Sequence, residues 1–165
     1  MLAGEGLVTR HLHKGFAVAE LGLGELADVY QARRALELSA VRFAARGDDS
    51  WLVDLRAALA AMGAAAAVGD TPSLLDADRR FHEVIVSTIG SERISRFYRL
   101  IQMEIRLTRA WHGPRMAASV FVDRHAEIVE ALEAHELDRG LELLERVIDD
   151  GQARLQQELR RPGNA

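Results

Sequence analysis

The hydrophobic positions of the chain repeat with two different periods, and the change of period divides the sequence in two. Residues 7–21 alternate apolar and polar side chains around a His-Lys-Gly triplet, a pattern typical of a β-hairpin with glycine in its turn. Further along, apolar residues recur every three to four positions, which indicates amphipathic helices. We therefore expect a hairpin region over 1–22 and a helical body over 25–160.

The helical body contains six apolar stripes separated by short polar or glycine-containing connections. Connections this short place consecutive helices antiparallel. The sequence therefore predicts an all-α fold, a six-helix antiparallel bundle preceded by the short β-hairpin. The expected helices cover residues 25–46, 50–67, 72–89, 91–112, 115–134 and 137–160.

The stripes also predict which side chains form the core. The stripe of the first helix ends at Phe43, and the fourth helix contributes the aromatic pair Phe97 and Tyr98. The last helix has a continuous seam of leucine and isoleucine without an inward charge. Such a seam suits the core of the bundle and is also suited to dimerisation.

Ionisable side chains occupy positions on three stripes where core residues belong. Asp78 and His82 lie one turn apart on the third helix, and His125 lies on the stripe of the fifth. A buried carboxylate needs a cation, a metal or a ligand, because leaving it unpaired costs several kcal/mol. Arg33 on the first helix needs an anion, and Glu37 lies one turn away. An ordinary i,i+4 ion pair at the stripe edge and a guanidinium that faces a ligand both remain open.

Composition narrows the classes of function. The chain has 165 residues, 48% of them hydrophobic, which is enough for one domain with a real core. It has no cysteine, so disulfides, thiolate catalysis and cysteine-ligated zinc are excluded. The net charge of -4 gives no overall basic surface for nucleic acid, and no apolar run reaches the roughly 20 residues of a membrane span. We expect a cytoplasmic protein with no membrane partner.

Three short motifs follow one another along the helical body. They are Tyr30-x-x-Arg33-x-x-Leu36-Glu37, Asp78-x-x-Phe81-His82 and His125-x-x-Ile128, the last followed by a final amphipathic helix. In this order and spacing they resemble the C-terminal effector domain of GntR-type bacterial transcription regulators, the FCD class. The resemblance covers roughly residues 25–159 and implies a ligand-binding helical domain.

The first residues resemble the end of the winged helix-turn-helix domain of the same regulators. The resemblance makes residues 1–22 a remnant of that domain and places Arg10, His11, His13 and Lys14 on its DNA-contacting wing. In such domains the recognition helix precedes the wing. DNA is therefore an expected partner only if the helix-turn-helix is present in the full protein.

Many FCD domains hold a metal with one aspartate and three histidines. The resemblance transfers the aspartate and two of the histidines onto Asp78, His82 and His125, whereas Val147 stands at the position of the third histidine. Asp150 is the less distant substitute for it, and a poor one. A carboxylate and two imidazoles still suit zinc, nickel, iron or manganese. In the alternative, Asp78 hydrogen-bonds one of the histidines and the group satisfies itself.

The resemblance implies a ligand-sensing regulatory domain, in a homodimer, rather than an enzyme. A small carboxylate metabolite would meet Arg33 and the cluster of Asp78, His82 and His125, with or without a divalent metal. Two other functions remain open: a helical dimerisation module with a vestigial site, and a metal-dependent enzyme. Against the enzyme, the sequence shows no nucleophile motif and no separate general base beside the cluster.

Overall fold

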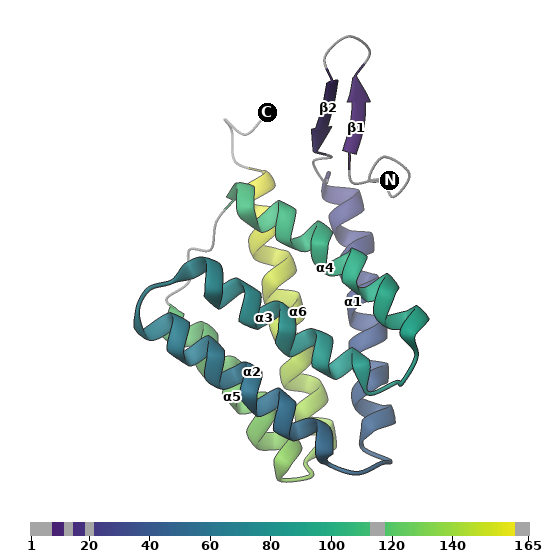
Figure 1. The fold of residues 1–165 in the computed structure, drawn as a ribbon, viewed down its shortest axis with the longest axis vertical. Coiled ribbons are helices and arrows are strands. Elements are labelled where there is room, and N and C mark those ends of the chain that lie inside the picture. Colours follow the sequence, from purple (N-terminus) through teal and green to yellow (C-terminus); the bar gives the residue numbers. More distant parts are fainter. Residues whose placement is uncertain (1–7, 12–14, 19–21, 113–117, 161–165) are drawn as a thin grey trace.

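Six helices form the body of the protein within the residues that the structure, a computed structural model, describes (8–11, 15–18, 22–112 and 118–160) (Figure 1). All six predicted helices are confirmed, each within three residues of the expected ends. They are α1 Leu23–Ala44, α2 Ser50–Ala67, α3 Thr71–Ser87, α4 Glu92–His112, α5 Ala118–Glu133 and α6 Leu137–Leu159.

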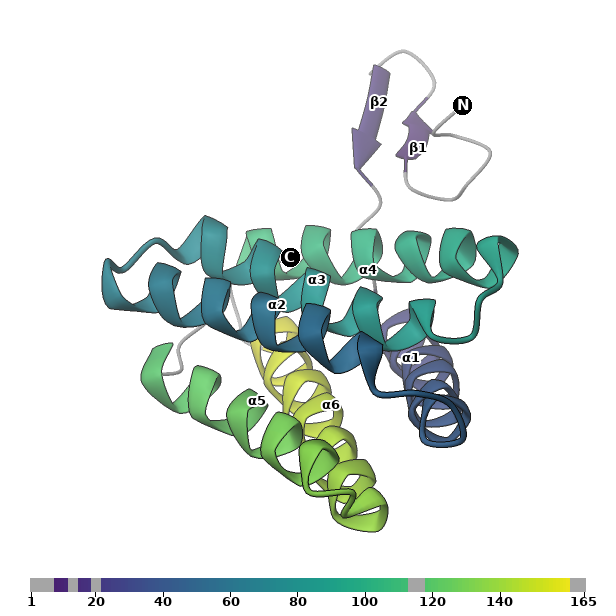
Figure 2. The same ribbon diagram turned by 60° about the horizontal axis from the view of Figure 1, so that its bottom comes forward.

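Two short strands precede the helices. β1 (Val8–His11) pairs antiparallel with β2 (Gly15–Val18), and Val8 lies opposite Val18. In both views the strands stand beyond the helices rather than among them (Figures 1 and 2). The pairing agrees with the alternation in the sequence. The identification of the strands as a DNA-binding wing has no support in the structure and stays a prediction.

Three consecutive pairs of helices, α2 with α3, α3 with α4 and α5 with α6, pack against each other, and helices distant in sequence close the bundle. α2 lies along α3 and also contacts α5, while α6 packs on α5 and α1, and α3 contacts both α1 and α4 (Figure 2). Gly69 and Gly90, each with φ of 71°, form the turns after α2 and α3, where a side chain would be strained. Asp70 caps α3 by accepting a 3.1 Å hydrogen bond from the Ser73 amide. These contacts bring α1, α3, α4 and α5 together around one interior.

Two aromatic residues that the sequence places in the core lie at the surface instead. Phe43 is 53% exposed and Phe97 is 56% exposed, whereas Tyr98 is buried at 1%. In α1 the buried face runs through Ala40 and Ala44, so Phe43 points away from the neighbouring helices. The prediction was wrong for these two phenylalanines because a helical stripe does not show how much of its width a neighbour covers.

The apolar seam of α6 is buried within its own bundle. Its central members are 0 to 8% exposed, and its two end members, Leu137 and Leu159, are half-buried; the central members are Leu141, Leu144, Ile148 and Leu155. Since these side chains already pack against the rest of the chain, they are not available to a second subunit. The structure thus favours the core role of this seam, and its role in dimerisation stays a prediction.

By length and composition, α2 is the one described helix that is apolar enough to cross a membrane. In this fold it packs against α3 and α5, and Leu55 and Met62 are fully buried there. A core helix of a bundle passes the same test of length and hydropathy.

Candidate metal and ligand site

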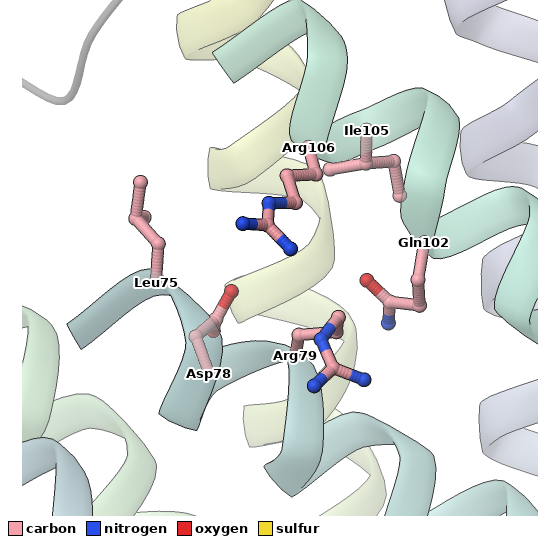
Figure 3. A pocket seen from close by; sticks show the side chains of 6 residues that line it. All are labelled: Leu75, Asp78, Arg79, Gln102, Ile105 and Arg106. Carbon is pink, nitrogen blue, oxygen red and sulfur yellow. The ribbon is translucent and has the colours of Figure 1, made fainter. Parts of the chain in front are cut away.

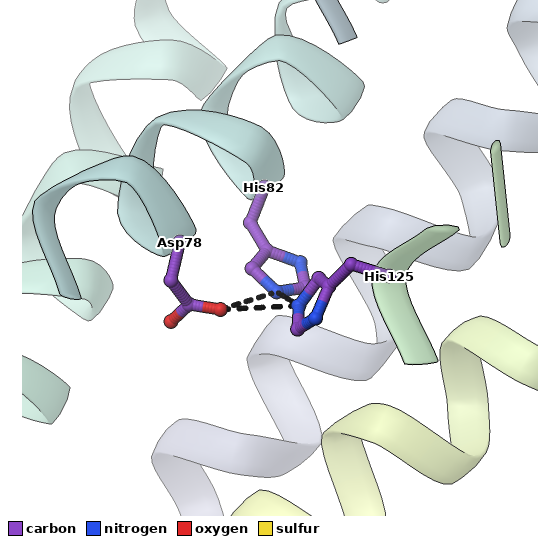
Figure 4. A group of neighbouring side chains, drawn as sticks. All are labelled: Asp78, His82 and His125. Carbon is purple, nitrogen blue, oxygen red and sulfur yellow. Dashed lines mark hydrogen bonds and ion pairs between the residues drawn. The ribbon is translucent and has the colours of Figure 1, made fainter. Parts of the chain in front are cut away.

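The structure brings Asp78, His82 and His125 together inside the bundle (Figure 4). α3 presents Asp78 and His82 one turn apart on its buried face, and α5 supplies His125 from the opposite side. All three residues are at most 3% exposed. The Asp78 Oδ1 atom lies 3.4 Å from His82 Nε2 and 3.1 Å from His125 Nε2, and the two Nε2 atoms are 3.4 Å apart.

This triangle has the dimensions of one face of a metal coordination shell. Two ligands at about 2.1 Å from a zinc ion lie about 3.0 to 3.4 Å apart when the angle between their bonds is about 90° to 109°. The three observed separations, 3.1, 3.4 and 3.4 Å, fall in that range. These separations therefore suit a divalent cation.

The hydrogen bonds on the far side of each imidazole assign its tautomer. His82 Nδ1 lies 2.7 Å from the Glu37 Oε2 atom, and His125 Nδ1 lies 2.7 Å from the Phe121 carbonyl oxygen. A carboxylate and a carbonyl can only accept, so each Nδ1 carries the proton and donates it. Each Nε2 of a neutral ring then directs a lone pair toward Asp78.

This assignment limits how the cluster can satisfy its own hydrogen bonds. A hydrogen bond between Asp78 and either Nε2 atom needs a proton there, either a second proton on that ring, which makes it an imidazolium, or a proton on the Asp78 carboxyl group. Burial lowers the pKa of His125, and the opposing effect of Asp78 does not restore it to the usual value. Each of the three side chains offers one donor atom to the same point, so together they could hold a cation.

Aromatic rings surround the two imidazoles. The Phe81 ring packs edge-on against His82 and His125, with centroids 5.4 and 5.0 Å apart, and Phe121 lies 4.8 Å from His125. These contacts restrict rotation of the imidazoles and exclude water from one side of the cluster.

Arg33 lies in the core and not at the edge of its stripe. Its guanidinium donates from Nε to the Glu37 Oε1 atom at 2.6 Å, and both side chains are at most 1% exposed. The expected pair with Glu37 is thus present, but it is a fully buried pair. Burial alone lowers the pKa of Arg33, while Glu37 raises it above the ordinary value, so the charge is retained. Arg33 does not line the cavity described next, and its role toward an effector stays a prediction.

A small cavity adjoins Asp78 on the side of α4 (Figure 3). It measures about 20 Å³, room for a water molecule. Gln102 and Arg106 extend into it from α4, and the Arg106 guanidinium points toward the Asp78 carboxylate. Arg79 also lines it, but its guanidinium is held by Asp76 and Glu83. The remaining lining residues are Leu75 and Ile105.

Sequence reasoning missed Gln102 and Arg106. Arg106 lies off the apolar stripe of α4, where a solvated charge is the usual interpretation, and Gln102 gives no signal on its own. Gln102 is nevertheless 4% exposed, and its Nε2 donates to the Tyr98 hydroxyl at 2.5 Å. The one signal in the sequence was the position of Gln102 one helical turn after Tyr98, a residue predicted to lie in the core.

Neither expected fourth position on α6 reaches the cluster. Val147 is packed on the outer side, where it lines a separate cavity between α5 and α6 together with Arg124 and Asp150. Asp150 forms an ion pair with Arg124. Asp150 is thus the poor substitute that its direction on the helix predicts, because Arg124 holds its carboxylate away from the cluster.

The four residues assigned to the wing are not described as side chains. Arg10 and His11 lie in β1, of which only the backbone is described, and His13 and Lys14 lie outside the described residues. Their role toward DNA stays a prediction.

Comparison with known proteins identifies the helical body. The profile of the FCD domain family matches residues 28–150, three quarters of the chain. The chain belongs to the FCD domain family. The predicted membership among GntR-type regulators is confirmed by relatives and by solved structures.

Two curated relatives of this FCD domain are described as repressors. The HTH-type transcriptional repressor GlaR of Escherichia coli (strain K12) is 30% identical over 154 residues, which cover 87% of this chain and 70% of GlaR. The "Probable D-xylose utilization operon transcriptional repressor" of Paenarthrobacter nicotinovorans is 28% identical over 133 residues, covering 81% of this chain and 59% of the relative.

A solved structure shares the fold of this FCD domain closely. The protein described as transcriptional regulator GntR from Rhodococcus sp. RHA1 superposes with a TM-score of 0.83 at 26% identity, over 94% of this chain and 75% of that one. Both the solved structure and the curated relatives extend beyond the region they share with this chain. The family and its relatives support a regulatory domain of a transcription factor.

Proposed function

We propose that this FCD domain senses a small carboxylate through a divalent metal held by Asp78, His82 and His125, and so controls the DNA binding of a GntR-type regulator. One observation carries the proposal: three buried ligand atoms from α3 and α5 converge at 3.1 to 3.4 Å. Family membership supplies the regulatory context.

The ligand set of nitrogen and oxygen atoms limits which metal ions the site can hold. Two imidazoles and one carboxylate suit zinc, nickel, iron or manganese, and three protein ligands leave coordination positions for water or an anion. Since Val147 replaces the usual third histidine, we expect weaker binding than in a site with four protein ligands, and a larger share of the coordination shell open to an effector.

The effector approaches from the cavity beside Asp78. Arg106 and Gln102 place hydrogen-bond donors there, and a guanidinium binds a carboxylate through two parallel hydrogen bonds. The cavity of about 20 Å³ holds only a water molecule, so an effector must displace Arg106 or part α3 from α4. An effector that binds better when α3 and α4 are apart would shift the bundle from the closed arrangement of this structure to that open one.

The rest of the assembly follows from the family. We propose a cytoplasmic homodimer in which the bundle sets the spacing of two DNA-binding heads, with Arg10, His11, His13 and Lys14 on their wings. Exposed Phe97 on α4 is available to such an interface.

Isothermal titration calorimetry tests the effector part. Protein loaded with zinc or nickel is titrated with a panel of small mono-, di- and tricarboxylic acids. At least one acid is expected to bind the loaded protein and not the metal-free protein. Its affinity should fall at least tenfold in Arg106→Gln. Arg99→Gln is the matched control, since Arg99 lies on the same helix, pairs with exposed Glu92 and does not line the cavity beside Asp78.

The competing function makes the opposite prediction. A dimerisation module with a vestigial site has no use for a metal, and Val147 is the observation that favours it. Indifference of the melting temperature to zinc and nickel, together with no heat from any acid, would support the module and reject the sensor.

A further inference from the structure

Glu37 connects three helices at a point just behind the candidate metal site. It lies on α1 with no exposed surface. Its Oε1 atom accepts hydrogen bonds from Arg33 Nε at 2.6 Å and from the Tyr98 hydroxyl at 2.5 Å, whereas its Oε2 atom faces only His82 Nδ1, at 2.7 Å, among the bonds described. The two oxygens are therefore engaged differently.

The carboxyl group of Glu37 is ionised in this setting. The Arg33 guanidinium lies 2.6 Å from Oε1 and is as deeply buried as Glu37, so the two side chains form an ion pair. A carboxylate can only accept hydrogen bonds, so the 2.7 Å contact requires the proton to be on His82 Nδ1. His125 is held in the same tautomer by a backbone carbonyl, which no side-chain substitution removes.

We infer that Glu37 is a positioning residue that makes His82 a metal ligand, by holding its ring in the Nδ1–H tautomer with the Nε2 lone pair directed at Asp78 and His125. The inference rests on the proposed function for the identity of the metal site. A ligating imidazole whose other nitrogen donates to a carboxylate is more basic and better oriented, and removal of such a partner typically lowers metal affinity 10- to 100-fold.

Glu37→Gln tests this role with little change in shape. Arg33 and Tyr98 are both donors to Oε1, so the amide oxygen of the new side chain takes that position and its NH₂ group takes the position of Oε2. The NH₂ group then donates to His82 Nδ1. His82 must move its proton to Nε2, where it blocks coordination.

The first measurement needs no variant and no metal. Long-range ¹H–¹⁵N correlation spectra of metal-free, ¹⁵N-labelled wild type report which ring nitrogen of each histidine is protonated. We expect Nδ1–H for both His82 and His125. A His82 ring that carries its proton on Nε2 in the wild type would overturn the inference, even if the protein binds metal.

The second measurement compares variants. In Glu37→Gln, His82 is expected to change to the Nε2–H tautomer while His125 does not, and zinc affinity, measured by competition with a chromogenic chelator, should fall 10- to 100-fold. Tyr98→Phe is the matched control, because it removes a donor to Oε1 and leaves the bond between Oε2 and His82 in place. Zinc affinity in this variant should stay within about threefold of the wild type.

The outcomes separate this inference from the proposed function. If the tautomers behave as expected but wild type binds no zinc or nickel, the metal proposal fails and the control of His82 by Glu37 stands. If wild type binds zinc and Glu37→Gln changes neither the tautomer nor the affinity, the inference fails and the metal proposal stands. Should Glu37→Gln not fold, the wild-type spectrum still decides the tautomer.

Discussion

Replacing Arg33 by methionine is expected to destabilise the protein much more than replacing its neighbour Arg34, although both arginines form ion pairs. Arg33 is paired with Glu37 at exposures of 1% and 0%. Arg34 is paired with Asp149 at exposures of 29% and 53%. The two arginines are adjacent in the same helix, so the comparison isolates burial from helix propensity and from the loss of one positive charge.

The expected losses follow from what each substitution leaves behind. Arg33→Met leaves the Glu37 carboxylate buried without its cation, which costs about 3 to 5 kcal/mol. Arg34→Met breaks an ion pair that water screens, which costs about 1 kcal/mol or less. For a protein of this size about 1 kcal/mol lowers the melting temperature by roughly 2 to 4 °C. Arg33→Met should therefore melt roughly 6 to 20 °C lower than wild type, and Arg34→Met at most roughly 4 °C lower.

Thermal unfolding followed by circular dichroism, at pH 7 and without metal, measures both losses. The reasoning is refuted if the two variants melt at the same temperature. It is also refuted if Arg33→Met is as stable as wild type. In that case the Arg33 guanidinium would be dispensable to the fold, and its predicted role toward an effector would become the better explanation of its position.

Two further predictions concern packing and pH. Gly140→Ala should lower the melting temperature by a few degrees, because its Cβ atom would lie 2.7 Å from Leu132 Cδ2, and overpacking of about 1 to 3 kcal/mol exceeds the helix propensity gained. Gly63→Ala, with nothing within 4 Å of the added Cβ, should instead raise it, and a rise in both variants would contradict the predicted contact. Burial, and then the charge of Glu37, raise the pKa of Tyr98 well above its ordinary value. As the pH rises, the Tyr98 hydroxyl therefore loses its proton in the unfolded chain before it does so in the folded protein. The free energy of unfolding should consequently fall above about pH 10. Denaturant titrations at pH 9 to 11 should show a steeper fall for wild type than for Tyr98→Phe, and parallel curves would contradict the shift.

Local spacing predicted much of the fold and the centre of the site. The 3.6-residue period gave all six helices, because each buries one face and exposes the other. The i,i+4 relation put Asp78 and His82 on one face of α3 and paired Arg33 with Glu37. These features depend on neighbours within a single helix, which a sequence displays directly.

What the sequence did not predict depends on contacts between helices. Glu37 was expected only as the anion that pairs with Arg33. Its second oxygen also contacts His82, which lies 45 positions away in another helix. Tyr98 was expected in an apolar core, yet its hydroxyl donates to Glu37. Arg106 was set apart from the site because its helix turns it off the apolar stripe, and only the packing of α4 on α3 brings it to Asp78.

The stoichiometry of metal binding tests the central claim most directly. Wild type and Asp78→Asn are dialysed against zinc or nickel, the bound metal per chain is measured by elemental analysis, and circular dichroism checks that both are folded. The account predicts one ion per wild-type chain and none in Asp78→Asn, because the amide removes the anionic ligand and directs a donor N–H or a weaker oxygen at the two Nε2 atoms. Wild type that binds no ion, or a variant that binds as much as wild type, would contradict it.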